Sequence, residues 1–189
     1  MDQVDRKIIS NLQLDGRTTL KKLAKEVGFT SMGVKKRLQK LLQREAIKVS
    51  ALLNPFALNL FPAVVLLEME SSDAMQRLLE RFKDCPRVIQ IFKTLGGYNL
   101  MALVVAEDKG TLESISIEKC SLRSGAGIRR SEFYPISDIY FSPFLPIREY
   151  LTHKGMDVAP CNVDCKSCAR YRKEKCVGCP ATVHYRGTL

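Results

Sequence analysis

Five of the seven cysteines in this chain lie close together near its end, at spacings typical of metal ligands. Their pattern is C-x3-C-x2-C-x7-C-x2-C within the stretch CNVDCKSCARYRKEKCVGCP. Both thiolates of a Cys-x-x-Cys pair can bind one ion, and a tetrahedral zinc site takes four such ligands. The sequence therefore predicts a metal centre with four ligands drawn from Cys161, Cys165, Cys168, Cys176 and Cys179.

Three kinds of site are compatible with these cysteines. Zinc is the commonest occupant of paired Cys-x-x-Cys motifs, and the cationic link ARYRKEK suits the negative charge of an ion bound by four thiolates. An iron–sulfur cluster is the second, because Cys161, Cys165 and Cys168 have a spacing that such sites use and CVGCP ends like a ferredoxin run. Disulfides are the third, with one thiol left over. We expect a metal, with zinc ahead of iron–sulfur.

The remaining cysteines and the two histidines lack such spacing. Cys85 and Cys120 each stand alone near the end of an amphipathic helix, so we expect small, partly buried hydrophobic side chains there. His153 and His184 flank the cluster, but single histidines are weak ligand signals and we leave them out of the predicted site. A tail this short has too little core to fold unaided, so a metal or disulfides would have to cross-link it.

The composition is that of a globular protein. Of 189 residues, 46% are hydrophobic and 26% are charged, which is not a signature of disorder. The apolar stretch LFPAVVLLEM is too short to span a bilayer, and the polar start MDQVDRK does not resemble a signal peptide. We therefore expect a cytoplasmic protein without a membrane partner, in which reduced thiols favour metal over disulfides.

The net charge of +10 is distributed unevenly. Residues 1–52 contain 12 Lys and Arg against 5 Asp and Glu, a net +7, whereas residues 53–152 carry −1 and residues 153–189 carry +4. A polyanion would therefore bind the first segment. The predicted domains are residues 1–53, residues 60–150 and residues 158–189.

The basic head has the periodicity of three helices. The stretches DQVDRKIISNLQLDG, TTLKKLAKEVG and TSMGVKKRLQKLLQREA each begin at Asp, Thr or Ser, which cap helices well. We expect the third to bury an apolar stripe of Val34, Leu38, Leu41 and Leu42. Two short helices, a tight turn and a third helix with a basic outer face are the signature of a helix-turn-helix. We expect IKVSALLNP to follow as a β-hairpin wing.

The outer face of the third helix is placed to bind double-stranded DNA. Lys and Arg neutralise phosphates, and polar side chains near the start of a recognition helix reach base edges in the major groove. A solvated helix face is the alternative, but the two preceding helices favour DNA. Arg37 lies beside the apolar stripe and either reaches a phosphate or covers the core. The predicted DNA-binding residues are Ser31, Lys35, Lys36, Arg37, Gln39 and Lys40.

Residues 60–150 show strand and helix patterns in the order β-α-β-β-α-β. PAVVLLEME, the two halves of RVIQIFKTLGGYNLMALVVAED, and GIRRSEFYPISDIYF have the character of strands, and SDAMQRLLERFKDCP and KGTLESISIEKCSLRS that of helices. This order predicts a ferredoxin-like antiparallel sheet with helices on one face. The fold class is thus α+β, with a winged helix-turn-helix before the sheet and a small Cys-rich module after it. The other face of the sheet needs a partner, so we expect a homodimer.

The segments DQVDRKIISNLQLDGRTTLKKLAKEVGFTSMGVKKRLQKLLQREAIK and, more loosely, LGGYNLMALVVAED resemble the Lrp/AsnC transcriptional regulators of bacteria and archaea. The resemblance covers residues 2–150 and leaves the Cys-rich tail as an addition. It implies a DNA-binding head, a sensing domain that forms dimers and often larger assemblies, and an effector, in many members an amino acid, near the turn between the second and third strands. By position the effector-binding residues are Gly96, Gly97, Tyr98 and Asn99.

The chain departs from the family pattern at two positions. Ala46 follows Glu45 where the family usually has Gly after the recognition helix, and Ala tolerates a left-handed helix cap poorly, so we expect a different helix end. Asn99 stands where the family usually has Asp, which removes a charge from the expected effector pocket. For Gly96 and Gly97, a plain hairpin turn is the alternative role.

Two alternatives belong to other function classes. Sirohaem decarboxylases of haem biosynthesis resemble these regulators, but they depend on histidines in the sensing domain, and both histidines here lie outside residues 53–150. No catalytic constellation stands out, so we do not expect an enzyme. The other alternative is a metal- or iron–sulfur-handling protein that uses the fold as a dimer scaffold. In a regulator, the tail would either be structural or sense metal or redox state and change DNA binding.

Overall fold

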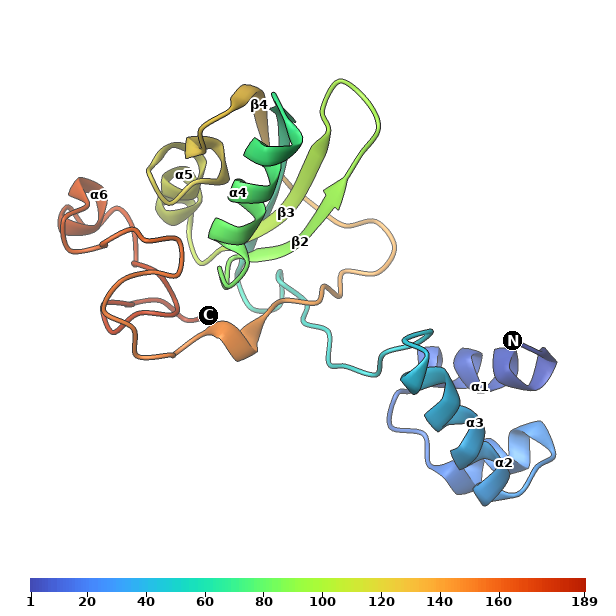
Figure 1. Ribbon diagram of the computed structural model, residues 1–189. Coiled ribbons are helices and arrows are strands. Elements are labelled where there is room, and N and C mark those ends of the chain that lie inside the picture. The colour runs from blue at the N-terminus through green and yellow to red at the C-terminus, as the bar shows by residue number, and fades with distance from the viewer. The chain divides into compact units, whose positions relative to one another are not determined.

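The three helices predicted in the basic head are present, and each starts at a capping side chain. The computed structural model describes residues 1–189 in two units, of which the first is Met1–Ala51 (Figure 1). Its helices are α1 (Gln3–Leu14), α2 (Leu20–Val27) and α3 (Ser31–Gln43). The side chains of Asp2, Thr19 and Thr30 accept hydrogen bonds from backbone N–H groups that have no partner within their helices. Local signals therefore set all three helix starts.

The core of the first unit is a narrow contact among the three helices. Ile8, Leu23 and Val34 are fully buried in it. The prediction that Leu42 is buried is wrong, because 41% of this residue is exposed, whereas Leu41 is buried. Helices α1 and α2 cover only a narrow stripe of α3. Val34 and Leu41 lie along that stripe, and Leu42 lies beside it.

Helix α3 ends in a left-handed turn at Glu45. The backbone angle φ of Glu45 is +52°. The N–H of Glu45 donates to the carbonyl of Leu42, and the N–H of Ala46 donates to the carbonyl of Leu41, both at 3.0 Å. These two bonds form a Schellman motif, which usually has Gly at the left-handed position. The left-handed residue is therefore Glu45, and Ala46, where we expected the conflict, is not strained.

The predicted wing is not formed. Residues 45–52 contain no strand, and Leu53 makes a single antiparallel bridge with Leu145. The two backbone hydrogen bonds of that bridge measure 2.9 and 2.8 Å. Residues 44–53 contain no Gly or Asn that would reverse a two-residue hairpin, and Asn54 stands at the far end of the expected wing, so the chain continues extended instead.

The second unit, Leu52–Leu189, contains the predicted βαββαβ motif. Its four strands form one antiparallel sheet in the order β2-β3-β1-β4, with β1 in the middle between β3 and β4. The strands are β1 (Phe61–Met69), β2 (Val88–Lys93), β3 (Leu100–Ala106) and β4 (Ile128–Pro135). This confirms the α+β class and the ferredoxin-like strand order expected from the alternating patterns.

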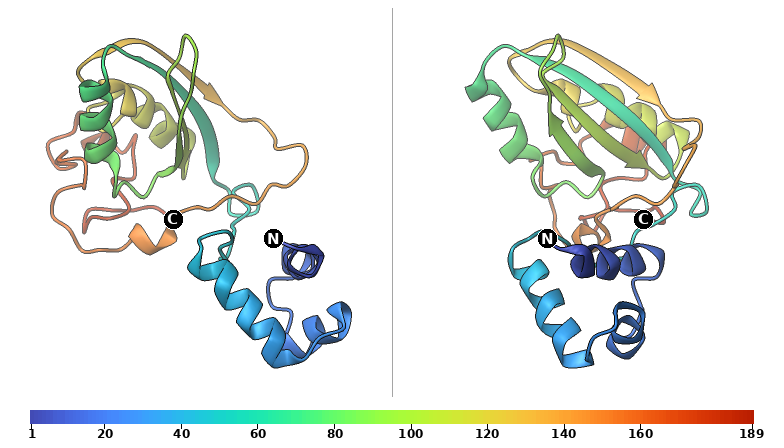
Figure 2. Two further views of the ribbon diagram at one scale, coloured as in Figure 1. Left: turned by 45° about the vertical axis from the view of Figure 1, so that its right-hand side comes forward. Right: turned by 90° about the vertical axis from the view of Figure 1, so that its right-hand side faces the viewer.

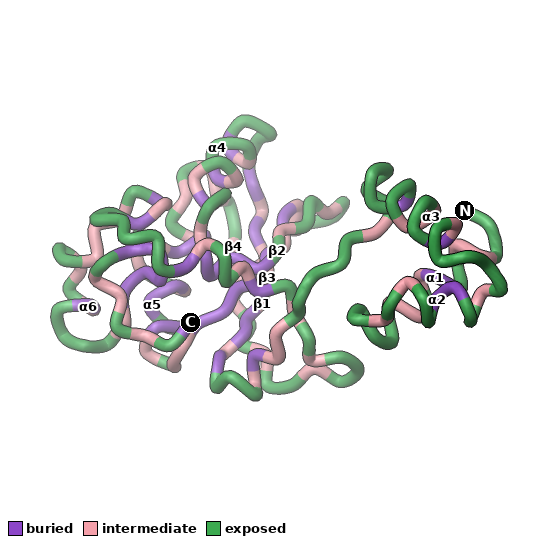
Figure 3. Tube along the Cα trace, turned by 90° about the horizontal axis from the view of Figure 1, so that it is seen from below, coloured by how far each residue is buried: buried purple, intermediate pink, exposed green.

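Two helices cover one face of this sheet (Figures 1 and 2). They are α4 (Ser72–Phe82) and α5 (Lys109–Ile117), and the short 3-10 helix η1 (Leu122–Ser124) follows α5. Along β1, every second residue from Ala63 to Met69 is buried against them, as the two-residue period of a strand requires. Figure 3 shows the buried residues gathered along the strands and on the helices that face them.

The other face of the sheet carries apolar side chains without a covering helix. Val64 and Leu66 on β1 are half-buried, and Tyr134 on β4 and Phe92 on β2 are exposed. The strand register places Tyr134 opposite Val64 and Phe92 opposite Met101. No helix of either unit is long and apolar enough to cross a membrane.

The cysteine-rich tail packs onto the sheet domain within the second unit. It runs past the 3-10 helix η2 (Glu149–Leu151) to the short helix α6 (Ala169–Arg172), and it lies beside α5 (Figures 1 and 2). Ala159, Cys161, Cys179 and Ala181 belong to the same buried cluster as the sheet and its helices. Residues 158–189 thus share a core with residues 60–150. The buried side chains of the tail pack against the sheet domain and not only against one another.

Candidate functional sites

Helix α3 presents most of the predicted DNA-binding residues on one exposed surface. Ser31, Lys35, Lys36, Gln39 and Lys40 are all exposed, while Val34 and Leu41 on the opposite side are buried. Thr30 caps the start of the helix, and its hydroxyl oxygen accepts from the N–H of Gly33 at 3.1 Å. The surface therefore combines the ammonium groups of three lysines with the hydroxyl of Ser31 in the first turn and the amide of Gln39 farther along the helix.

Arg37 differs from the other predicted DNA-binding residues, because its guanidinium is occupied within the unit. Its Nη1 atom lies 2.7 Å from Asp2 Oδ2 and 2.9 Å from Asp5 Oδ1, and the group also lies over the ring of Phe29 at 5.2 Å. The backbone N–H of Asp5 and then the Arg37 guanidinium hold the pKa of Asp2 below its usual value. Arg37 thus joins α3 to the start of α1 through ion pairs, an arrangement that differs from both roles considered for it.

The turn between β2 and β3 contains the four residues expected to bind an effector. Gly96 and Gly97 are exposed, and Tyr98 and Asn99 are half-buried. The amide of Asn99 makes two hydrogen bonds to Met69 at the end of β1: it accepts from the N–H at 2.8 Å and donates to the carbonyl at 2.9 Å. Asn99 therefore ties the turn to the central strand and has little hydrogen-bonding capacity left for a ligand.

A polar cluster from β4 lies against this turn. The hydroxyls of Tyr98 and Tyr134 both donate to Glu132, and these two bonds hold the pKa of Glu132 below its usual value, that from Tyr134 most strongly. The guanidinium of Arg130 lies over the Tyr98 ring at 4.5 Å. Glu132 and Arg130, which no local sequence pattern marks, bring one negative and one positive group to the β2–β3 turn.

All seven cysteines of the chain line one apolar cavity of about 40 Å³, which is large enough for a metal ion. Cys85 comes from the turn between α4 and β2, and Cys120 from the segment after α5. Both are partly buried, as expected, but they share this cavity with the tail cysteines. The tail cysteines in the lining are Cys161, Cys165, Cys168, Cys176 and Cys179.

The cysteines are free thiols, and they do not yet surround a common point. No group of three or more His, Cys, Asp or Glu side chains is arranged to hold a metal ion, so binding would require thiol side chains to turn toward one centre. Burial raises the pKa of Cys161 to about 11 and that of Cys179 to about 12. Burial also raises the pKa of Cys120, and negative charge on neighbouring tail cysteines raises it further.

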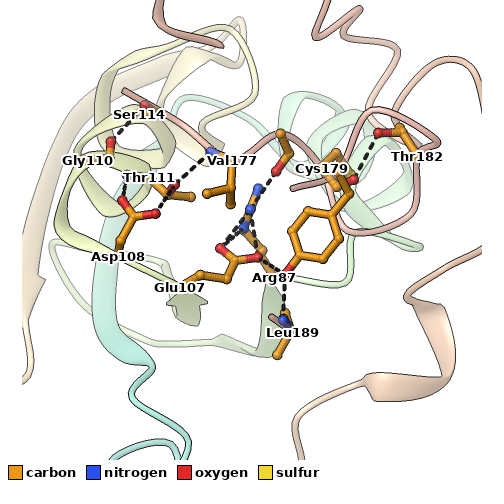
Figure 4. Close-up of polar contacts among 12 residues, drawn as sticks. Arg87, Glu107, Asp108, Gly110, Thr111, Ser114, Val177, Cys179, Thr182 and Leu189 are labelled. Carbon is orange, nitrogen blue, oxygen red and sulfur yellow. Dashed lines mark hydrogen bonds and ion pairs between the residues drawn. The ribbon is translucent and has the colours of Figure 1, made fainter. Parts of the chain in front are cut away.

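Arg87, which lines the cavity, belongs to a buried ion pair with Glu107. The side chains of Arg87 and Glu107 are only 7% and 3% exposed, and Nη2 of Arg87 lies 2.7 Å from Oε2 of Glu107 (Figure 4). The same Nη2 donates to the carbonyl of Gly178 in the tail at 2.6 Å, and the hydroxyl of Tyr185 donates to Glu107 at 2.6 Å. Burial opposes the charge of Arg87, but the Glu107 carboxylate, together with negative charge on Cys176 and Cys179, raises the arginine pKa overall.

The first turn of α5 holds the tail by close backbone contact. The N–H of Val177 donates to the Thr111 hydroxyl at 3.1 Å (Figure 4), and Arg170 Nη2 donates to the carbonyl of Gly110 at 3.1 Å. A Cβ atom on Gly110 would lie 2.8 Å from the carbonyl oxygen of Lys175, so only Gly admits the tail at this distance. The tail is therefore docked through specific polar contacts as well as through apolar burial.

Two family models match the two folded parts in order. An AsnC-type helix-turn-helix domain matches residues 1–42, and an Lrp/AsnC ligand binding domain matches residues 62–140, together more than half of the chain. The chain belongs to the Lrp/AsnC family of transcriptional regulators. The family is generally non-enzymatic.

Individual relatives are distant. The HTH-type transcriptional regulator FL11 of Pyrococcus horikoshii is 24% identical over 115 residues, which cover 60% of this chain and 76% of that protein. The Bkd operon transcriptional regulator of Pseudomonas aeruginosa is 29% identical over 135 residues, covering 68% and 88%. The solved structure of E. coli AsnC has a TM-score of 0.65 at 20% identity, covering 75% of this chain and 95% of that one, which supports the fold.

Five of the seven cysteines that line the cavity lie outside the two segments that match the Lrp/AsnC family models. The family models end at residue 140, before the five tail cysteines, whereas Cys85 and Cys120 lie inside the ligand binding domain. Sequence reasoning set these two cysteines aside because nothing within a few residues of either resembles a ligand motif. Only their position in the fold brings them to the tail.

Proposed function

We propose that this Lrp/AsnC-family protein is a sequence-specific transcriptional regulator that binds double-stranded DNA through α3 as a homodimer. The observation that carries the proposal is the exposed polar and cationic surface of α3, with Lys35 and Lys36 side by side, on a helix-turn-helix whose other surface is buried. Ammonium groups release counterions from phosphates, and Ser31 and Gln39 can hydrogen-bond to base edges. Arg37, held by Asp2 and Asp5, supports this surface from behind.

A salt-dependence measurement tests the DNA-binding surface. Lys35→Ala/Lys36→Ala should weaken binding to every DNA sequence and reduce the slope of log K against log salt by about 2, because each phosphate contact contributes about 0.9. The matched control is Lys83→Ala/Lys154→Ala, which removes the same charge from exposed positions of the second unit. Equal affinity and slope in the two double variants would refute the assignment of α3.

Dimerisation is proposed through the part of the helix-free sheet face around Val64 and Leu66, beyond the end that Ile147 and Leu189 cover. Its half-buried Val64 and Leu66 and its exposed Tyr134 leave apolar area that a second copy of the same face would cover. Leu66→Glu places a charge at the centre of this face and should produce monomers in sedimentation experiments. The matched control, Arg77→Glu on the exposed side of α4, should leave the oligomeric state unchanged.

A small-molecule effector is proposed at the β2–β3 turn, where Gly96, Gly97 and Tyr98 lie. The charged groups available to such a ligand are Arg130 and Glu132, while Asn99 holds the turn in place. Calorimetric titration with amino acids, comparing wild type with Arg130→Ala, tests whether this class of ligand binds there.

A metal centre, zinc or alternatively an iron–sulfur cluster, is proposed at the tail cysteines. It is supported by the presence of five tail cysteines in the lining of one apolar cavity, at sequence spacings suited to chelation. Such a centre would either support the tail or make DNA binding depend on metal or redox state. Elemental analysis and a visible spectrum of anaerobically purified protein test it: stoichiometric zinc in a colourless protein indicates zinc, and broad visible absorption with iron and sulfide indicates a cluster.

A further inference from the structure

We propose that Cys85 and Cys120 of the ligand binding domain supply ligands to the same metal centre as the tail cysteines, so that the metal joins the tail to the domain. This inference rests on the proposed metal centre and adds its ligand set and its mechanical role. The occupant is a thiophilic ion or an iron–sulfur cluster, both of which are bound by cysteine thiolates.

The first argument is the composition of the cavity. Seven of the fourteen residues that line it are cysteines, and these are all the cysteines that the chain contains. Cysteine packs well as a small hydrophobic side chain, but packing alone gives no reason to gather every thiol of a 189-residue chain in one place. Thiolate ligation does give such a reason.

The second argument is where the two domain cysteines stand. Cys85 and Cys120 line a second small cavity, which also contains Arg87 and Ile115 and lies between the sheet and its helices. Because both cysteines border both cavities, they stand at the boundary between the core of the domain and the tail. A metal bound by either of them and by tail cysteines would link the domain to the tail, whereas a metal bound by tail cysteines alone would not.

The third argument is that the tail is already held at this position by contacts independent of any metal. Arg81 Nε donates to the carbonyl of Cys161 at 3.2 Å, and Arg87 donates to Gly178, next to Cys179. Backbone groups beside two tail cysteines are thus fixed to the domain. A metal would therefore bind to a tail that already lies against the domain.

Metal affinity of the 189-residue protein tests the ligand set. Cys85→Ser and Cys120→Ser, singly and together, are compared with wild type by elemental analysis, by competition with a chromophoric chelator for zinc, and by the visible spectrum after iron and sulfide reconstitution. Because a buried hydroxyl costs stability, Cys85→Ala and Cys120→Ala are measured alongside, and far-UV circular dichroism checks their folding. The control is Ile115→Val, which alters the lining of the same cavity without removing a thiol.

We expect at least one of the two cysteines, when replaced, to lower metal affinity about tenfold or more, because loss of even an outer-shell partner costs about 10- to 100-fold. The isoleucine control should keep wild-type affinity. Removing the metal with a chelator should make the tail of wild type more sensitive to protease. Wild-type affinity in the folded double variant would refute the shared ligand set alone, and a wild type that takes up neither zinc nor iron would refute the metal centre itself.

Discussion

The buried ion pair between Arg87 and Glu107 should be among the largest single contributions to the stability of the second unit. Arg87→Met preserves much of the side-chain volume but leaves the Glu107 carboxylate, which is 3% exposed, with only the Tyr185 hydroxyl as a partner. Removing one member of a buried pair costs about 3–5 kcal/mol. The variant also leaves the Gly178 carbonyl without its donor. We therefore expect the free energy of unfolding to fall by about 4 kcal/mol.

Urea unfolding of the metal-free protein measures this cost. The chain has no Trp, and all six Tyr lie in the second unit, so tyrosine fluorescence follows that unit alone. In Arg87→Met/Glu107→Gln no buried charge is left unpaired, and coupled residues typically deviate from additivity by about 0.5–3 kcal/mol, so this double variant should cost clearly less than the sum of its single variants. The control Arg77→Met, at an exposed position of α4, should change stability by less than about 0.5 kcal/mol. A cost of Arg87→Met below about 1 kcal/mol, or strict additivity, would refute the reasoning.

Three further predictions concern the end of α3, the β2–β3 turn and the contact between α5 and the tail. Glu45→Gly should stabilise the first unit by about 1 kcal/mol in thermal unfolding followed by the helical circular dichroism signal, because it removes a left-handed non-glycine residue, whereas Ala46→Gly should not stabilise it. Asn99→Ala removes two hydrogen bonds to the end of β1 and should cost about 1–3 kcal/mol by tyrosine-monitored urea unfolding; no loss would mean that the turn is held by other contacts. Gly110→Ala should push the tail off α5 and speed its limited proteolysis, since its Cβ would lie 2.8 Å from a tail carbonyl, while Gly96→Ala, with no atom closer than 3.9 Å, serves as the control.

Sequence patterns were reliable where the deciding interactions are local. Asp2, Thr19 and Thr30 cap their helices as expected, because a cap needs only side-chain and backbone groups two or three residues apart. The alternation along β1 likewise predicts which residues face the helices. The same reasoning failed for the wing and for Leu42, since whether a segment pairs or a side chain is covered depends on what lies next to it in space.

The sequence by itself determined the order of the elements, the basic surface of α3 and the membership of five cysteines in one motif, because each depends on short-range spacing or on composition. Only the tertiary structure decided that Cys85 and Cys120 share a cavity with that motif. It also decided that Arg87 pairs with Glu107 and bonds to Gly178, which is 91 residues away in the chain. No spacing rule links such positions, because their proximity follows from the packing of the tail against α5 and the start of β2, which only the complete fold specifies.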